Sequence, residues 1–379
     1  MRRLFLLVSA AVLVDTMFYA AIAPLLPTYQ ADLELSKTGA GILSASYAAG
    51  TLLGALPAGW LAGRAGAKPT MLLGLGLLCG SSLTFGVADD IVLLDSARFV
   101  QGLGGACTWA GGLAWLIALT PRERRGELIG SALGAAIIGV LLGPVLGGAA
   151  TETSPELVFS LVAVVAAALF AVAALTPAGP RAETSGWGEL GAAMRTPGVL
   201  VAVWLFTLPA LFSGVIDVLV PLRLDDLGAS GVTIGAVFLA AAAVEGVISP
   251  FVGRLSDRRG RFLPIRFGLV GAAAASVLLP LPAAVWLLGA TVVLSVAALG
   301  LFWAPGGALL SDASESSGLD QGFAFGLMNL AWAGGQVLGG AVGGGLADAT
   351  SDAVPYTVLG LLALATLVLT RPRAHVAAA

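Results

Sequence analysis

Long apolar runs recur along the whole sequence, and they limit what this chain can fold into more than any other feature. Each run has about 18 residues or more, which crosses roughly 30 Å of hydrocarbon at a helical rise of about 1.5 Å per residue. Hydrophobic residues make up 58% of the chain and charged residues 11%, too few for a water-soluble protein. The sequence therefore predicts an all-α polytopic membrane protein with twelve transmembrane helices. They are expected at residues 4–27, 38–60, 69–88, 91–118, 127–150, 156–176, 198–222, 231–253, 263–282, 284–310, 321–347 and 353–370.

Basic residues gather in the loops on one side of the predicted membrane. Of the 19 lysines and arginines, only Lys37 and Arg223 fall on the other side, and Arg98 falls within a span. Cytoplasmic loops carry an excess of Lys and Arg, so we expect a multi-pass protein of the cell inner (plasma) membrane with both termini in the cytoplasm. The basic residues on the expected cytoplasmic side are Arg2, Arg3, Arg64, Lys68, Arg122, Arg124, Arg125, Arg181, Arg195, Arg254, Arg258, Arg259, Arg261, Arg266, Arg371 and Arg373.

Several classes of function lack the residues that they need. His375 is the single histidine, so neither a histidine-based metal site nor a Ser/His catalytic set can form within the spans. No GxxxxGKS or GxxxxGKT run is present to hold ATP, and Cys79 and Cys107 have no CxxC spacing. The basic residues form no nucleic-acid patch. We therefore expect no enzyme, no cofactor and no metal, but a monomer in the lipid bilayer that handles protons and a small-molecule substrate.

The chain divides into two similar halves. Residues 176–198, rich in Pro, Gly and charge, separate the sixth and seventh spans. We expect an N-terminal six-helix bundle at 1–176, a cytoplasmic linker at 177–197 and a C-terminal six-helix bundle at 198–379, the plan of a transporter with its site between two bundles. At an offset of 194 residues the halves match without a gap in the pairs Pro27/Pro221, Asp32/Asp226, Gly41/Gly235, Gly59/Gly253, Arg64/Arg258 and Gly66/Gly260.

Two matching loops of the halves carry a recognisable motif. The loop at 253–261 reads GRLSDRRGR and resembles the G-x-L-x-D-R-x-G-R loop of the major facilitator superfamily. The resemblance implies the major facilitator fold, with a latch at the inner surface around Asp257. The counterpart at 59–68 reads GWLAGRAGAK and has Gly63 where the motif has Asp, so the latch is expected to be complete in one half only. The residues that match the motif are Gly59, Arg64, Gly253, Asp257 and Arg258.

The fifth span carries a spaced set of glycines with a proline. The spacing resembles the G(x8)G(x3)GP(x2)GG signature of the superfamily's drug:proton antiporters. Missing side chains allow close helix approach and the proline bends the helix, so this span is expected to form a rigid seal between the halves. The chain has 52 glycines, so isolated pairs such as Gly50 and Gly54 are attributed to composition. The residues of the signature are Gly130, Gly139, Gly143, Pro144, Gly147 and Gly148.

The first span resembles that of the vesicular amine carriers and their bacterial relatives. Asp15 is followed by Pro24 and Pro27, similar to their D-x-M…P-x-x-P pattern, and the fourth span carries RFVQGLGG from Arg98. In the C-terminal half Asp217 resembles an acidic residue of their seventh helix, but other charged positions of those carriers are not matched. The resemblance implies proton-coupled export of a lipophilic compound rather than vesicular amine specificity.

Three carboxylates inside the spans are candidates for proton coupling. Asp15 lies roughly 16 Å into the membrane at about 1.5 Å per residue, near the midplane. Intramembrane ionisable groups are functional by default, so we expect Asp15 to bind and release a proton as its distance to Arg98 changes; a structural ion pair with Arg98 is the alternative. Glu245 is the second candidate, unless it stays permanently neutral. Asp217 is the third, unless it faces the external vestibule.

Aromatic and amide side chains at mid-span supply candidate substrate contacts. Trp prefers the membrane interfaces, so tryptophans at mid-span are expected to line an aromatic cavity for a flat or cationic compound, with plain packing as the alternative. Gln336 shares a helical face with two of these residues. The candidates are Tyr19, Tyr47, Trp109, Trp303, Asn329 and Trp332.

Three interpretations of the function stay open. We favour a secondary active transporter that exports small lipophilic or cationic compounds by proton antiport. A facilitator or importer of a sugar or organic acid would keep the fold, but the glycine signature and the scarcity of midplane Asn and Gln argue against it. A non-transporting membrane sensor would keep the fold as well, but it would have no need for intramembrane carboxylates.

Overall fold

The computed structural model describes residues 2–120, 125–179, 191–319 and 321–370, whose regular elements are helices. The surroundings of side chains are described for the same residues except 125–133 and 321–323. In chain order the helices are α1 (Arg2–Ala20), α2 (Ile22–Asp32), α3 (Lys37–Arg64), α4 (Ala67–Val87), α5 (Ile91–Leu119), α6 (Arg125–Glu152), α7 (Pro155–Leu175), α9 (Pro197–Asp226), α10 (Gly231–Arg259), α11 (Phe262–Leu278), α12 (Val285–Ser316), α13 (Gln321–Val337), η2 (Leu338–Val342), α14 (Gly343–Ala349) and α15 (Ala353–Leu369).

The helices form twelve membrane-spanning segments, which confirms the predicted fold class. Nine stretches of the described chain are helical, long and apolar enough to cross a membrane, and α1 with α2 counts as one of them. The apolar helices α11 and α15 are shorter. The one remaining segment of the twelve consists of α13, which continues through the π-helical turn η2 into α14.

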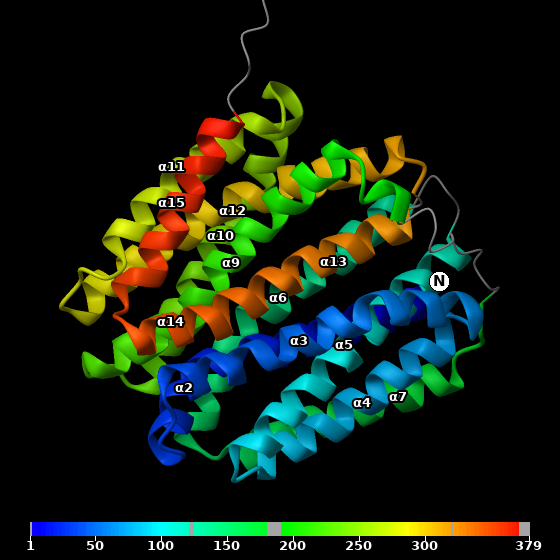
Figure 1. Cartoon of the computed structure of the whole chain (residues 1–379). Coiled ribbons are helices and arrows are strands. Elements are labelled where there is room, and N and C mark those ends of the chain that lie inside the picture. The colour runs from blue at the N-terminus through cyan, green and yellow to red at the C-terminus, as the bar shows by residue number, and fades with distance from the viewer. Residues whose placement is uncertain (1, 121–124, 180–190, 320, 371–379) are drawn as a thin grey trace, which may run out of the picture.

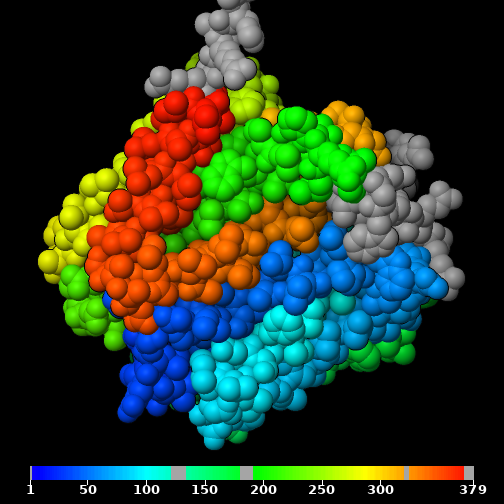
Figure 2. Space-filling model, in the orientation of Figure 1, coloured from blue at the N-terminus to red at the C-terminus, as the bar shows by residue number. Residues whose placement is uncertain are grey.

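The segments are arranged in two bundles of six. In the first bundle α5 packs against α3 and α4, and α1 packs against α6; in the second, α12 packs against α10 and α11, and α9 against α13. Figure 1 shows the first bundle in blue to green and the second in green to red, and Figure 2 shows that they touch along a broad face. The main contacts between the bundles join α6 to α10 and α3 to α13. The bounds of the linker at 177–197 stay a prediction, because residues 180–190 lie outside the described part.

Small residues allow α3 and α5 to approach closely. A Cβ atom at Gly50 would lie 2.0 Å from the carbonyl oxygen of Phe99, and one at Gly54 would lie 3.0 Å from the Cβ of Ala106. Neither position leaves free room for a side chain. The attribution of this glycine pair to composition alone is therefore wrong, because both residues set the distance between two helices.

The backbones of the two bundles approach each other most closely at one end of the molecule. We call the end where α3 begins the Lys37 end, and the end where α3 finishes the basic end. At the Lys37 end a Cβ at Gly41 would lie 2.4 Å from the carbonyl oxygen of Gly340, and one at Gly235 would lie 2.6 Å from the carbonyl oxygen of Pro144. These are contacts between backbones of opposite bundles.

Glycines closer to the basic end meet the opposite bundle more loosely. A Cβ at Gly326 would lie 3.7 Å from a side-chain atom of Leu56, and one at Gly246 would lie 3.5 Å from a side-chain atom of Ile137. Both are ordinary van der Waals distances to flexible side chains. The bundles are therefore held together backbone to backbone at the Lys37 end, and through side chains at these positions nearer the basic end.

Candidate functional site

Asp15 lies in the interior of the first bundle, where α1 crosses α5. Its side chain is 0% exposed, and its Oδ2 accepts a hydrogen bond of 3.0 Å from the Tyr47 hydroxyl on α3. A Cβ at Gly105 on α5 would lie 3.0 Å from both carboxylate oxygens and 2.7 Å from the Tyr47 hydroxyl oxygen. The carboxylate therefore packs on bare backbone of α5, and Gly105 supplies the room for it.

The other oxygen of the Asp15 carboxylate has no hydrogen-bond partner in the described part of the chain. Oδ1 is buried and accepts no hydrogen bond from any residue that the structure describes. The indole of Trp109 lies near the carboxylate but does not complete a hydrogen bond of good geometry to Oδ1. Buried polar atoms are paired as a rule, and the exceptions in native proteins need an explanation such as a catalytic or redox role. Oδ1 is an atom that can take up a proton without breaking an existing contact.

Arg98 on α5 does not form an ion pair with Asp15, the structural alternative for these two residues. In the described part of the chain no Asp15–Arg98 ion pair occurs, and the guanidinium donates hydrogen bonds of 3.3 Å to the Phe18 carbonyl, 3.1 Å to the Tyr19 carbonyl and 2.7 Å to Gln101 Oε1. The ion-pair alternative therefore does not hold in this conformation. The fork of the guanidinium reaches two backbone carbonyls at once.

The position of Arg98 follows from a break in the first span. The α1 helix ends at Ala20 and α2 begins at Ile22. Pro24 has no N–H group and cannot donate to the carbonyl four residues earlier, so the helix is weakened at this point. Carbonyls near the break need other donors, and Arg98 supplies two hydrogen bonds to the last turn of α1. Arg98 thus contacts the first span where its helix is interrupted.

A row of side chains connects Asp15 with the second bundle. The Tyr47 ring lies 4.8 Å from the Tyr19 ring, and Trp332 on α13 lies 5.3 Å from Tyr19 and 6.3 Å from Tyr47, measured between ring centroids. Gln336 Nε2, one turn beyond Trp332, donates a hydrogen bond of 2.8 Å to the Tyr19 hydroxyl. The row thus crosses from α1 and α3 of the first bundle to α13 of the second.

The row ends at the Asp217 carboxylate on α9. Gln336 Nε2 lies 3.4 Å from Asp217 Oδ2, so one amide group contacts both the Tyr19 hydroxyl and a carboxylate of the second bundle. Asn329 lies on α13 two turns before Gln336 and is half-buried. Together, Asp15, Tyr19, Tyr47, Trp332, Gln336 and Asp217 are called the cross-bundle row below.

Glu245 and Trp303 form a separate cluster inside the second bundle. Glu245 on α10 contacts α12 at Gly300, where a Cβ would lie 3.1 Å from the glutamate Cγ, and the Trp303 indole is within hydrogen-bonding reach of the carboxylate. The Trp303 ring packs edge-on against Phe206 of α9 with centroids 5.2 Å apart. The predicted single aromatic cavity is therefore divided: Trp332 contacts the tyrosines, whereas Trp303 contacts Phe206.

The glycines of the fifth span face α1 of their own bundle. A Cβ at Gly139 would lie 2.0 Å from Thr16 Oγ1, one at Gly143 would lie 2.4 Å from the Ala20 Cβ, and one at Gly147 would lie 2.1 Å from the Ala21 carbonyl oxygen. Contact with the opposite bundle comes from the Pro144 carbonyl and from Gly148, next to α10. The α6 helix thus joins α1 along one face and α10 along another. The surroundings of Gly130 lie outside the described residues.

The loop motif at the basic end forms contacts within the second bundle. Asp257 accepts a hydrogen bond of 2.6 Å from Arg261, whose other nitrogen lies 3.5 Å from Asp312 at the end of α12. Asp257 thus pairs with Arg261, the last residue of the same loop motif. A Cβ at Gly59 or at Gly253 would meet no atom within 4 Å. Arg64 lies over the Trp60 ring at 5.3 Å, and Arg258 is exposed.

Three residues of this region, Gly105, Gln101 and Gln336, were not among the candidates predicted from the sequence. Gly105 carries no side chain, so only its place four residues after Gln101 in the arginine motif could have indicated it. Gln101 itself accepts from Arg98 and belongs to that motif. Gln336 was placed on the correct helical face, but its contact with Tyr19 joins segments 317 residues apart and has no local signal.

Two six-helix bundles with ionisable groups buried between spans define the class of polytopic membrane transporters. The sequence agrees with this class, since it matches the Major Facilitator Superfamily over residues 8–318 and 208–378. The chain belongs to that superfamily.

Individual relatives support the assignment to the superfamily. The chain is 24% identical over 261 residues to the synaptic vesicular amine transporter of Mus musculus, which is 67% of this chain and 50% of that protein. It is 25% identical over 265 residues to the uncharacterized MFS-type transporter YcaD of Escherichia coli, 69% of this chain and 68% of that protein. A probable vesicular acetylcholine transporter-B of Danio rerio is 34% identical over 141 residues, 35% of this chain and 29% of that protein. The chain thus spans half or less of the length of these vesicular relatives.

A solved structure shows the same fold. The crystal structure of a D-xylose-proton symporter superposes with a TM-score of 0.73 and covers 96% of each chain at 16% sequence identity. Identity at this level supports the shared architecture alone.

Proposed function

We propose that this chain is a proton-coupled antiporter that exports small lipophilic or cationic compounds. The observation that carries the proposal is the cross-bundle row, which connects a carboxylate of each bundle through side chains of both. Transporters of this plan move their two bundles around a central site. A site made of residues from both bundles changes its contacts whenever the bundles move, so ligand binding and movement are coupled.

The charge of Asp15 gives a physical reason for exchange. The side chain is fully buried, and no ion pair to it exists among the described residues. A bare carboxylate in an apolar interior costs several kcal/mol, so the site favours either a bound proton or a cationic ligand. A proton and a cationic ligand neutralise the same carboxylate, so binding of one displaces the other. This competition at one carboxylate is the simplest form of antiport.

Aromatic faces beside the carboxylate favour a cationic or flat substrate. Tyr19, Tyr47 and Trp332 contact one another, and Trp109 lies near Asp15. Aromatic rings attract cations by about 0.5–2 kcal/mol, more strongly where water is excluded. The Glu245–Trp303 cluster repeats the combination of a carboxylate with an indole in the second bundle, so we include it as a second position for a proton.

We place the basic end in the cytoplasm, because Lys and Arg concentrate in cytoplasmic loops. In this orientation the bundles are closest at the external end, as expected of a state that receives substrate from the cytoplasm. We further propose that the protein acts as a monomer in the inner membrane, with its bundles at 1–176 and 198–379.

Uptake into vesicles tests the proposal. Purified protein is reconstituted into liposomes with an acidic lumen, and accumulation of the lipophilic cation tetraphenylphosphonium is followed beside that of D-xylose. We expect accumulation of the cation only while the pH gradient lasts. Asp15→Asn should abolish it, whereas Asp95→Asn should not, since Asp95, near the start of α5, accepts a hydrogen bond from Ser46 and is not a member of the cross-bundle row. Uptake of D-xylose, or cation uptake that ignores the gradient, would contradict the proposal.

A further inference from the structure

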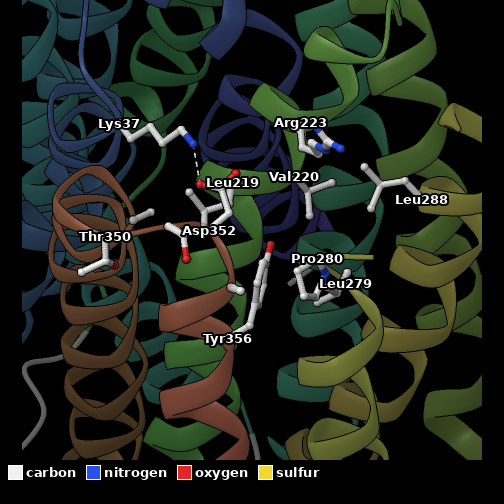
Figure 3. Close-up of a pocket in the computed structure, with 13 residues that line it drawn as sticks. Lys37, Leu219, Val220, Arg223, Leu279, Pro280, Leu288, Thr350, Asp352 and Tyr356 are labelled. Carbon is white, nitrogen blue, oxygen red and sulfur yellow. Dashed lines mark hydrogen bonds and ion pairs between the residues drawn. The ribbon is translucent and has the colours of Figure 1, made fainter. Parts of the chain in front are cut away.

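A separate cavity of about 440 Å³ lies at the Lys37 end, away from the cross-bundle row. Its walls come from the end of α9, the turn between α11 and α12, and the turn between α14 and α15, with Lys37 of the first bundle at its rim (Figure 3). The volume lies within the range of small-molecule sites, roughly 300–1,000 Å³. The transport proposal makes no use of this cavity.

Both basic residues that the sequence places on this side of the membrane line the cavity. Lys37 and Arg223 are the two exceptions among 19 lysines and arginines, apart from the intramembrane Arg98, and they come from different bundles. Basic residues are disfavoured on the external side of a membrane protein. Lys37 and Arg223 both line the same cavity on this side. Their convergence therefore indicates a negatively charged ligand.

The two cations differ in how they are paired. Lys37 forms an ion pair with Asp352, and the two side chains are 31% and 32% exposed. Arg223 is half-buried, and its guanidinium has no hydrogen bond or ion pair among the described residues. With one carboxylate and two cations, the lining carries a net charge of one positive unit. Arg223 is the group that remains free to bind an anion.

A hydroxyl group and an apolar wall complete the cavity. The Tyr356 side chain is 3% exposed, and Figure 3 shows its hydroxyl directed toward the space between Asp352 and Pro280. In the described part of the chain this hydroxyl makes no hydrogen bond, so it is available as a donor. The apolar part of the lining is Leu219, Val220, Leu279 and Leu288.

We propose that this cavity binds a phosphate group carried by an apolar molecule, with Arg223 and the Tyr356 hydroxyl as donors to the phosphate oxygens. Arginine matches a phosphate with two parallel hydrogen bonds, which a lysine cannot do. The apolar wall holds the carbon part of the ligand. The phosphate can belong to the headgroup of an anionic lipid or to a soluble phosphate compound.

Binding of two probes to the purified full chain in neutral detergent tests the proposal. The probes are dioctanoyl phosphatidylglycerol and inorganic phosphate, and dioctanoyl glycerol is the uncharged comparison. We expect the wild-type chain to bind the phosphatidylglycerol, and Arg223→Gln to weaken this binding by about tenfold, the loss of one charge-assisted contact. Tyr356→Phe should weaken it less. Arg254→Gln is the matched control at the basic end, where the guanidinium lies over the Phe251 ring, and should bind as the wild type does.

The outcomes separate the two sources of phosphate. Displacement of the lipid by inorganic phosphate indicates a soluble ligand, and its absence indicates a lipid headgroup. Should Arg223→Gln fail to fold, Arg223→Lys and added salt test the same contact, and both should weaken binding. The proposal is overturned if the wild-type chain binds neither probe, if dioctanoyl glycerol binds equally well, or if folded Arg223→Gln binds the phosphatidylglycerol as tightly as the wild type.

Discussion

Gln336 of the second bundle donates one hydrogen bond of 2.8 Å to the Tyr19 hydroxyl of the first bundle, and the same nitrogen lies 3.4 Å from Asp217. One amide group thus joins a half-buried phenol to a half-buried carboxylate across the interface of the bundles. In a low-dielectric interior such contacts are stronger than in water, and leaving them unpaired is costly. The closed arrangement of the bundles therefore depends in part on this side chain.

Gln336→Leu should shift the molecule away from this arrangement. Loss of a buried hydrogen bond costs about 0.5–1.5 kcal/mol, which is roughly a threefold to tenfold change in the balance of two states. The separation of the bundles at the Lys37 end can be measured by electron–electron resonance between spin labels at the exposed positions Asp32 and Thr357, with Cys79 and Cys107 replaced by alanine. Gln30→Leu is the control. An unchanged distance distribution in Gln336→Leu would show that the contact does not hold the bundles.

Asp15→Asn should uncouple transport from the pH gradient. The amide cannot ionise, so the site stays neutral and neither releases a proton nor attracts a cation. We expect loss of gradient-driven accumulation, and weaker binding of tetraphenylphosphonium by roughly 1–3 kcal/mol, about the value of a hydrogen bond to a charged group. Tyr47→Phe should keep coupling, since it removes the donor to Oδ2 and leaves the carboxylate. If Asp15→Asn still accumulates the cation in response to the pH gradient, the proton-coupling role would be assigned to Glu245. The Glu245→Gln variant is measured alongside it for comparison.

Gly105→Ala should damage the site more than the fold. The added methyl group would lie 3.0 Å from both Asp15 carboxylate oxygens and 2.7 Å from the Tyr47 hydroxyl, so the two side chains must separate. We expect transport to fall strongly while the melting temperature changes little, because side-chain ends can move where backbones cannot. Gly80→Ala, where a Cβ meets no atom within 4 Å, is the control. Wild-type transport by Gly105→Ala would show that this geometry is not required.

Much of the fold could be predicted from the sequence because each span has a strong local signal. A run of about 20 apolar residues must cross the bilayer as a helix, and the carboxylate of Asp15 is then placed in depth by counting. The offset pairs, such as Gly41 and Gly235, further indicated the two halves. Both glycines meet backbone of the opposite bundle, at Gly340 and Pro144.

The contacts within the site could not be predicted in the same way. Helical periodicity shows which residues share a face, but not which helix lies opposite that face. Arg98 was therefore assigned to Asp15, although it donates to the Phe18 and Tyr19 carbonyls beside the break in the first span. Trp303 was grouped with Trp332 for the same reason, although each contacts a different aromatic partner.

Gly143→Leu should prevent α6 from packing on α1. A Cβ there would already lie 2.4 Å from the Ala20 Cβ and 2.8 Å from the Met17 carbonyl oxygen, and a leucine extends much further. Overpacking costs roughly 1–3 kcal/mol, and more where the obstacle is backbone. We expect a clear fall in melting temperature and loss of coupled export. Gly134→Leu is the matched control on the same helix, since a Cβ at Gly134 meets no atom within 4 Å. Equal melting temperatures would refute the packing role of Gly143.

Asp348 and the start of α3 form a second link between the bundles, outside the spans. Asp348 Oδ2 accepts hydrogen bonds of 3.1 Å from the Thr38 N–H and 2.7 Å from the Thr38 hydroxyl, and Oδ1 accepts one of 3.3 Å from the Lys37 N–H. The carboxylate of one bundle thus caps a helix of the other, where N–H groups lack partners. Hydrogen bonds from Thr38 and then from Ser36 hold the pKa of Asp348 below its ordinary value, although slight burial opposes them.

The lowered pKa of Asp348 determines how this link responds to pH. A carboxylate with a lowered pKa stabilises the closed end at every pH above its ordinary value, and the stabilisation is lost only as the pH falls through the lowered pKa. Between neutral and mildly acidic pH we therefore expect Asp348 to stay ionised and the label distance at the Lys37 end to stay the same, with opening by this route only in strong acid. Asp348→Ala should open the end at neutral pH, and Thr38→Val should do so more weakly because one of three hydrogen bonds is lost. Should the wild-type end open in mild acid and the response vanish in Asp348→Asn, the link would be the pH sensor, and the assignment of that role to Asp15 would be wrong.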